Sequence, residues 1–175
     1  MAKYKRLLVV GRFQPPHEGH VALVRHALSL AEQVVVVIGS AQESHTVRNP
    51  LTAGERFELL DKLLRSRLGS DFVRVRIVPV MDINMNKVWV QYLRMLLPRF
   101  EGVVTRNPLV AELFEDMGLA VEEQPLYDRE RCEGTRIRRL ALEGGPWQEC
   151  VPPEIVGDLV SIGFERRLRR LAGEG

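Results

Sequence analysis

The chain has 175 residues, of which 45% are hydrophobic and 27% are charged, and its formal net charge is only +2. This size and composition are typical of one globular domain, residues 1–175, with a complete core. So small a net charge argues against a nucleic-acid partner and favours small anions bound at a local site.

Three further features bear on where the protein works. Residues 3–6 lead into only a short apolar run, which does not resemble a signal peptide. The apolar stretches all fall short of the ~20 residues that a membrane helix requires. Cys132 and Cys150 have neither C-x-x-C pairing nor zinc-site spacing. We therefore expect a cytoplasmic protein that makes no membrane contact.

The first predicted unit is a strand, a turn and a helix. Residues 7–10 are an apolar run that predicts a strand, and the chain breaks at Gly11. A turn stiffened by Pro15 and Pro16 follows. Beyond His20 the apolar residues recur at helical spacing, which predicts a helix.

The start of that helix has the properties of an anion site. A helix N-terminus offers unpaired N–H groups and about half a positive charge. His17 and His20 are spaced to share one helix face. Gly19 leaves room for a phosphate beside them, and Arg12 adds a permanent cation. We interpret this segment as a phosphate site, with two unrelated surface histidines as the alternative.

The second strand and helix follow the same order. Residues 34–38 form a continuous apolar run, typical of a strand buried on both faces. A polar loop, residues 41–51, carries Arg48. Thr52 and Glu55 then form a capping-box pattern that predicts a helix to about residue 67. The apolar face of this helix is expected to hold Phe57, Leu60, Leu63 and Leu64.

The middle of the chain predicts a third strand and helix. Residues 73–80 have the composition of a strand, and Asp82 lies in the loop after it. A helix is predicted over residues 87–97, and Pro98 ends it.

The last strands are short. Residues 102–105 predict a fourth strand, and Asn107 and Pro108 then suit the N-cap and first position of a helix. Gly118 is expected to close that helix in a left-handed conformation. Residues 119–122 can form a fifth strand.

This alternation predicts an α/β fold, a Rossmann-like doubly wound sheet of five parallel strands. The sheet core would span about residues 6–124, and a helical C-terminal segment about residues 125–175. The absence of a G-x-G-x-x-G turn argues against a dinucleotide-dependent dehydrogenase. Ligands bind such sheets at the carboxyl ends of the strands. The loops at that edge carry Arg12, His17, His20, Arg48, Asp82 and Asn107.

The C-terminal segment contains a second candidate phosphate site. Gly134 and Thr135 open a predicted helix, with Thr135 able to cap it, and Arg138 follows one turn later. Arginine offers a fixed fork of donors that suits a polyphosphate. An ordinary basic helix is the alternative. Residues 152–153 open another helix, and residues 164–171 form an amphipathic helix that faces solvent or another subunit.

The H-x-G-H of residues 17–20 and the T-x-x-R of residues 135–138 resemble the two motifs of the nucleotidylyltransferase superfamily, with Gly134 where a serine is usual. The resemblance is closer to one family, the archaeal type of nicotinamide-nucleotide adenylyltransferase, over roughly residues 6–170. It rests on the blocks GRFQPPHEGH, GSAQESHTVRNPLTAGER, PVMDIN, KVWV, NPLV and EGTRIRR. Pro16 departs from that pattern, where an aromatic residue is usual, and so does the pair Thr105-Arg106 before Asn107, where small residues are usual.

The resemblance implies that nicotinamide mononucleotide (NMN) and ATP give NAD and pyrophosphate, with Mg²⁺, in a homo-oligomer that is typically a hexamer. It implies no protein residue as a metal ligand. The implied catalytic residues are His17, His20 and Arg138. The implied ATP-binding residues are Arg12, Gly19, Arg48, Asn107 and Thr135. The implied NMN-binding residues are Phe13, Asp82 and Trp89.

Some readings stay open. The spacing around Trp89 alone favours a core tryptophan, and only the resemblance implies stacking on nicotinamide. The same chemistry could serve another acceptor, such as phosphopantetheine or flavin mononucleotide (FMN). A regulator that senses NAD or ATP without chemistry is the alternative outside enzymes.

Overall fold

A computed structural model describes residues 1–125 and 133–173 of the chain. Its centre is one sheet in which every neighbouring pair of strands is parallel, in the order β3-β2-β1-β4-β5. The strands are β1 (Tyr4–Gly11), β2 (Ala31–Ile38), β3 (Val75–Pro79), β4 (Gly102–Val104) and β5 (Ala120–Glu122). The predicted fold class is confirmed.

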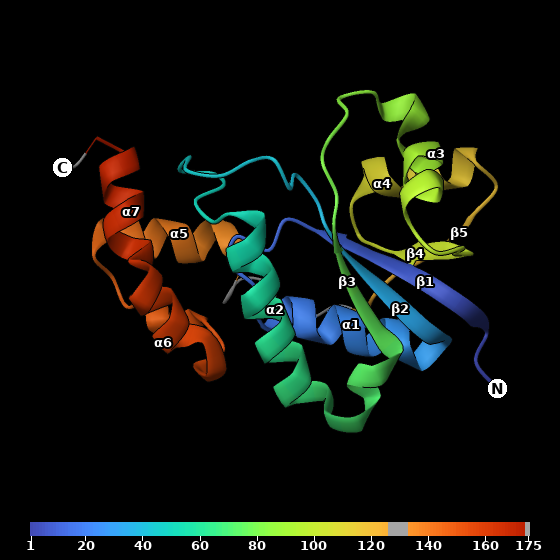
Figure 1. Cartoon of the computed structure of the whole chain (residues 1–175), viewed down its shortest axis with the longest axis horizontal. Helices are drawn as coiled ribbons and strands as arrows, with labels where there is room; N and C mark the ends of the chain where they lie inside the picture. Colours follow the sequence, from blue (N-terminus) through green and yellow to red (C-terminus); the bar gives the residue numbers. More distant parts are fainter. Residues whose placement is uncertain (126–132, 174–175) are drawn as a thin grey trace.

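Helices cover both faces of the sheet (Figure 1). On one face, α1 (Glu18–Leu30) and α2 (Ala53–Leu68) form a core with the side chains of Leu7 and Val9. On the other face, α3 (Asn86–Leu96) and α4 (Pro108–Asp116) pack against Leu8. Both cores exist because successive side chains of a strand point to opposite faces.

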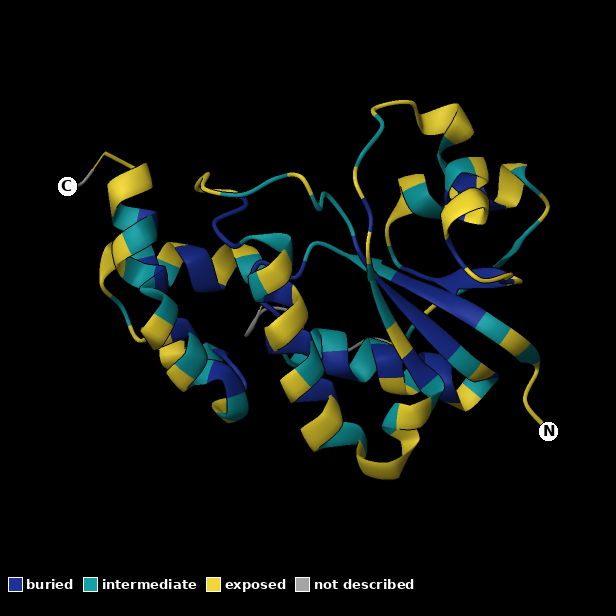
Figure 2. Ribbon diagram, in the orientation of Figure 1, coloured by how far each residue is buried: buried dark blue, intermediate teal, exposed yellow. Residues whose placement is uncertain are grey.

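The C-terminal segment is helical, as predicted, with α5 (Gly134–Glu143), α6 (Pro153–Ile162) and α7 (Phe164–Leu171). These helices turn their buried sides toward α2 (Figure 2). Their apolar cluster joins Ile137 and Phe164 to Leu59 and Leu63 of α2 and to Val21 of α1. This packing brings the start of α5 to the turn that follows β1. None of the helices in the described ranges is long and apolar enough to cross a membrane.

The strand order places the candidate site. The chain leaves β1 toward β2 on one side, whereas β4 pairs with β1 on the other. The loops after β1 and β4 therefore diverge at the carboxyl end of the sheet, which is where such folds open a crevice for ligands.

Local capping signals were predicted correctly. Thr52 Oγ1 accepts from the N–H of Glu55, and the Glu55 carboxylate accepts from the N–H of Thr52. Asn107 caps α4 through the N–H of Leu109, with Pro108 at the first helical position. Gly118 has a φ of +69° after that helix.

The predicted start of the third strand is wrong. Gly69–Arg74 form a 3₁₀ helix, and β3 begins only at Val75. Arg74 holds this turn to the base of the sheet, because its guanidinium donates to the carbonyls of Leu28, Ala31 and Glu32. Val73 is consequently 73% exposed.

Two side-chain placements also differ from prediction. Phe57 does not join the apolar face of α2 but is 38% exposed, because the inward position beside it is taken by Arg56, which is fully buried. Thr135 does not cap α5. The helix starts at Gly134, with Glu133 as an N-cap that makes no side-chain bond.

Candidate functional site

The turn after β1 is shaped by a close packing of backbone and ring. Phe13 is buried and has a φ of +55°, which folds its ring back over the end of the strand. A Cβ on Gly11 would lie 3.0 Å from this ring, so glycine is the residue that fits. The Phe13 ring then supports the imidazole of His20, with ring centres 4.4 Å apart.

The two histidines cap α1 reciprocally. Nδ1 of His17 accepts from the N–H of Gly19 over 3.1 Å, and Nδ1 of His20 accepts from the N–H of His17 over 3.1 Å. A neutral imidazole that accepts at Nδ1 carries its proton on Nε2. The two capping bonds thereby fix the orientation of both rings and leave Nε2 as the nitrogen that carries the proton. Burial, and then the neighbouring His17, lower the pKa of His20 well below its usual value, so its imidazole is neutral at pH 7.

Gly19 is required by the same cap. A Cβ at this position would lie 2.9 Å from Cε1 of His17, which is closer than Cβ atoms come to other atoms. The glycine therefore allows the His17 ring to fold over the helix start, and it lines the same cavity as that ring.

Arg138 joins α5 to the turn after β1. Its Nη1 donates to the carbonyl of Gln14 over 2.8 Å, and its Nη2 donates to Oγ1 of Thr135 over 3.3 Å. Burial, and then the charges of Arg12 and Arg48, lower the pKa of Arg138 to about 10. The guanidinium is still charged at neutral pH, and a bound polyanion would relieve the repulsion among these cations.

Gln14 joins the same turn to the loop between β2 and α2. Its side chain is buried and makes two bonds to the backbone of Leu51, each 2.9 Å long. Nearby, Nη1 of Arg12 donates to Asn49 over 3.3 Å. Burial and the charge of Arg48 lower the pKa of Arg12, against an opposite effect of Asp82.

Arg56 is the main residue that sequence analysis missed. Although charged, it is 0% exposed, and its guanidinium donates to five backbone carbonyls. These carbonyls belong to Arg12, Gly39, Ser40, Glu43 and Thr52. One side chain thus ties the turn after β1, the end of β2 and the start of α2 together. The only hint in the sequence is an arginine directly after the Thr52–Glu55 cap.

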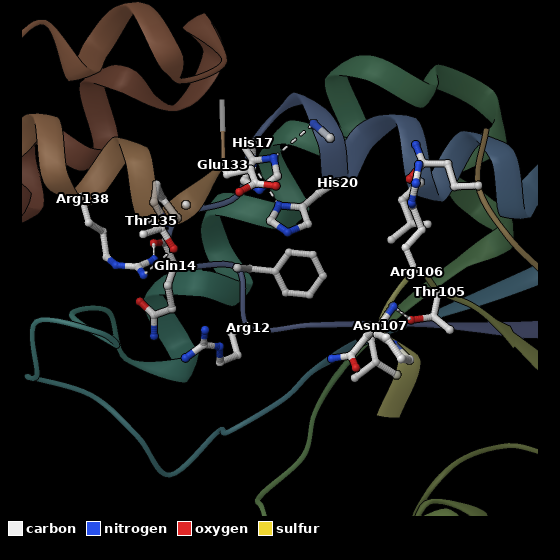
Figure 3. A pocket seen from close by; sticks show the side chains of 18 residues that line it. Arg12, Gln14, His17, His20, Thr105, Arg106, Asn107, Glu133, Thr135 and Arg138 are labelled. Carbon is white, nitrogen blue, oxygen red and sulfur yellow. Dashed lines mark hydrogen bonds between the residues drawn. The ribbon is translucent and has the colours of Figure 1, made fainter. Parts of the chain in front are cut away.

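These side chains surround a cavity of about 590 Å³ between α1, α5 and the loop after β4. In Figure 3 the two histidines lie between Arg138 with Thr135 on one side and Thr105, Arg106 and Asn107 on the other. Among the predicted site residues, eight line this cavity: Arg12, Phe13, His17, Gly19, His20, Asn107, Thr135 and Arg138. Sequence analysis did not select Gln14, Thr105 and Arg106, which also line it.

Asp82 and Trp89 lie elsewhere, in a second cavity of about 400 Å³ bounded by α3 and α4. Trp89 is partly buried, and its ring lies edge-on to Phe114 with centres 6.0 Å apart. The two cavities meet, because Val10, Arg12, Thr105 and Asn107 line both. Phe13 lines only the first of these two cavities, and Arg48 lies on an exposed loop and lines neither.

A parallel sheet with H-x-G-H at its carboxyl edge and two adjoining cavities suits the transfer of a group between two bound molecules. The cytidylyltransferase-like family model matches residues 8–140, a range that includes both histidines and Arg138. The fold and the site are those of a nucleotidyltransferase.

Curated relatives refine this class. The nicotinamide-nucleotide adenylyltransferase of Aeropyrum pernix is 56% identical over 168 residues, which cover 95% of this chain and 97% of the relative. That of Ignicoccus hospitalis is 47% identical, with coverage of 95% and 98%. The chain therefore belongs to the cytidylyltransferase-like family and, within it, to the nicotinamide-nucleotide adenylyltransferases.

A solved structure shares the fold. A bifunctional NMN adenylyltransferase/ADP ribose pyrophosphatase from Francisella tularensis, crystallised with AMP and a manganese ion, superposes with a TM-score of 0.81 at 21% identity. The match covers 98% of this chain and 52% of that one, so the present chain spans about half the length of the bifunctional protein.

Proposed function

We propose that the chain transfers the AMP moiety of ATP to NMN, giving NAD and pyrophosphate. An oxygen of the NMN 5′-phosphate attacks the α-phosphorus of ATP, and the bond from that phosphorus to the oxygen bridging to the β-phosphorus breaks. The observation that carries this proposal is that two oriented imidazoles and three arginines, Arg12, Arg106 and Arg138, line one cavity, which meets a second cavity lined by Trp89.

The chain's part is alignment and charge stabilisation, because the phosphate of NMN is itself the nucleophile. We assign His17 and His20 to the α- and β-phosphates, where charge develops as pyrophosphate leaves. Their capping bonds fix the direction of each donor before substrate arrives, so the orientation costs nothing at the moment of reaction.

The cations would hold the outer phosphates. Arg12 and Arg138 line the cavity, and the Thr135 hydroxyl and the backbone N–H groups at the start of α5 lie beside Arg138. Asn107 stands where the two cavities meet and would contact the transferred phosphate. We assign Arg48, on the exposed loop before α2, to an additional phosphate contact that forms when ATP is bound.

ATP would enter as its magnesium complex. The described residues contain no group of three or more His, Cys, Asp or Glu side chains able to hold a metal ion. Magnesium commonly binds through substrate phosphates and water with few protein ligands, which agrees with this donor set. The ion would contribute charge neutralisation on the phosphates.

The second cavity is our assignment for NMN. A cationic nicotinamide ring is attracted to an indole face, so Trp89 would stack on it, with Asp82 near the mononucleotide. Phe13 does not line this cavity. We assign it a supporting part, in which its ring holds His20 in place.

A pyrophosphate-release assay tests this proposal. ATP–Mg²⁺ would be supplied with NMN, nicotinic acid mononucleotide, phosphopantetheine or FMN in separate reactions. We expect the fastest release with NMN and none without an acceptor. Equal turnover of phosphopantetheine would contradict the choice of NMN. Binding of ATP or NAD with no release for any acceptor would identify a sensing regulator instead.

We infer further that the sheet and the C-terminal helices act as one domain, because Arg138 of α5 completes the cavity at the end of β1. We also propose a homo-oligomer, with a hexamer as the expected state. Exposed apolar side chains on α3, such as Met95 and Leu96, support self-association. Light scattering of the purified protein would show a mass six times that of one chain.

A further inference from the structure

Arg106 combines a permanent charge with an unmet hydrogen bond. It lies two residues after the end of the short strand β4 and lines the larger of the two cavities described above. Its Nη1 is buried and has no hydrogen-bond partner within residues 1–125 and 133–173. A guanidinium stays protonated, so this nitrogen is always a donor. A buried charged donor without an acceptor is unfavourable, and a small rotation of the guanidinium toward the cavity would let a ligand supply the acceptor.

The position of Arg106 indicates which part of a nucleotide it meets. Arg138 and Thr135 lie on the opposite side of the histidines (Figure 3). The outer phosphates belong with those groups, and the reacting phosphorus belongs where the two cavities meet. The part of the cavity beyond the histidines is left for the nucleoside. The cavity lining also includes Leu23, Pro108 and Gln124, a mixture of apolar and neutral polar groups that suits a purine ribonucleoside better than a polyphosphate.

We propose that Arg106 is a specificity residue that donates a hydrogen bond from Nη1 to the adenosine half of the nucleotide. This inference rests on the proposed function for the identity of the substrates. The acceptor is a neutral one, either a ribose hydroxyl oxygen or a purine ring nitrogen. The phosphates stay with the histidines, Arg12 and Arg138.

The reversible reaction separates this role from the others. ATP and NAD both contain adenosine, whereas NMN and pyrophosphate do not. Loss of a contact to adenosine raises KM for ATP in the forward direction and for NAD in the reverse direction. Loss of a contact to phosphate raises KM for pyrophosphate as well, and loss of a contact to the acceptor raises KM for NMN.

The test compares wild type with Arg106→Met, which keeps an unbranched apolar stem but removes the donors. We expect KM for ATP and NAD to rise roughly ten- to a hundredfold, the scale of a hydrogen bond from a charged group. KM for NMN and pyrophosphate and the value of kcat should not change. Arg139→Ala, an exposed arginine on α5, is the control and should leave all five values unchanged. Unchanged KM for ATP, or a rise for pyrophosphate or NMN, would overturn the proposal.

Two further measurements keep the result interpretable. Calorimetry with AMP and with pyrophosphate needs no turnover, so it tests the Arg106 contact even if NMN is not the acceptor. Arg106→Met should weaken the binding of AMP and leave the binding of pyrophosphate unchanged. The second measurement is the binding of ATP analogues to the unmodified protein. Each analogue lacks one acceptor, as 2′-deoxy-ATP and 7-deaza-ATP do, so weaker binding identifies the acceptor atom that Arg106 contacts. The proposal fails if wild type binds every such analogue as tightly as ATP.

Discussion

The backbone N–H of His17 donates to Nδ1 of His20 over 3.1 Å, and the two imidazole rings lie with their centres 3.7 Å apart. His17 in turn accepts from Gly19. Each ring is therefore both a helix cap and a donor, because the nitrogen that caps cannot carry the proton. The geometry that begins α1 also sets the direction of the two rings.

We predict that His20→Ala lowers kcat by two or more orders of magnitude, the scale of a lost oriented donor at a developing charge. ATP binding should weaken much less, since Arg12 and Arg138 remain. His26→Ala, on the same helix but outside the cavity lining, should retain activity. Steady-state kinetics and calorimetry with ATP measure the two effects. Turnover close to wild type would remove His20 from its proposed role.

Stability should depend on pH through His20. The pKa of this imidazole is lowered in the folded chain from its usual 6.5, chiefly by burial. Below pH 6.5 the unfolded chain binds a proton at His20 that the folded chain does not. The free energy of unfolding therefore has its full value above pH 6.5 and falls as the pH decreases below it. Thermal unfolding between about pH 8 and 5 should show this loss in wild type and a smaller loss in His20→Ala. Equal slopes would contradict the prediction.

The carboxylates of Glu55 and Glu122 affect stability in a lower pH range. The pKa of Glu55 is lowered by its hydrogen bonds from Arg167, and that of Glu122 by its bond from Lys3. Their contributions are present above their usual pKa of 4.5 and disappear only below it. These two carboxylates therefore do not account for a loss of stability between pH 6.5 and 5.

We predict that Arg56→Met lowers the free energy of unfolding by at least about 3 kcal/mol, because it leaves buried carbonyls without their donor. It should also raise KM for ATP, since the carbonyl of Arg12 is one of those released. Arg65→Met on the same helix is the control. Its side chain is 63% exposed, pairs with Asp61 and lies over the ring of Phe72, so a change of no more than about 1 kcal/mol is expected. Denaturant unfolding of both variants measures the two changes in the free energy of unfolding.

The two tryptophans should behave oppositely. Trp147 is 1% exposed, packs on Phe164 and donates to Glu165 over 3.0 Å, so Trp147→Ala should cost about 3–5 kcal/mol of stability. Trp89 is only partly buried at the second cavity. Trp89→Ala should therefore destabilise less while it raises KM for NMN and leaves KM for ATP unchanged. An unaltered KM for NMN would argue against stacking.

Features encoded by neighbouring residues were predicted well. The Thr52–Glu55 cap, the Asn107–Pro108 helix start and the left-handed Gly118 each depend on residues a few positions apart. Their hydrogen bonds close within one turn, so the pattern can be seen without the fold. The start of β3 was misplaced because Arg74 holds the 3₁₀ turn through carbonyls more than thirty residues earlier in the chain.

The contacts that organise the site could not be predicted in this way. Arg56 resembles any helix arginine in sequence, and only the fold shows that backbone carbonyls from two other segments meet around it. Gln14 reaches Leu51 across 37 positions. Arg106 could be noted as a departure from the family pattern, but its buried nitrogen depends on how the loop after β4 faces α1.

Residue spacing alone was sufficient for the alternating α/β class, the caps, the anion-binding start of α1 and the family motifs, because periodicity and capping act over short stretches of chain. The convergence of Arg138 with two histidines more than a hundred residues earlier, and the separation of Trp89 from Phe13 into two adjoining cavities, depended on the strand order with β1 at its centre. That order follows from burying both faces of one sheet, an energy shared among distant residues that no short segment specifies.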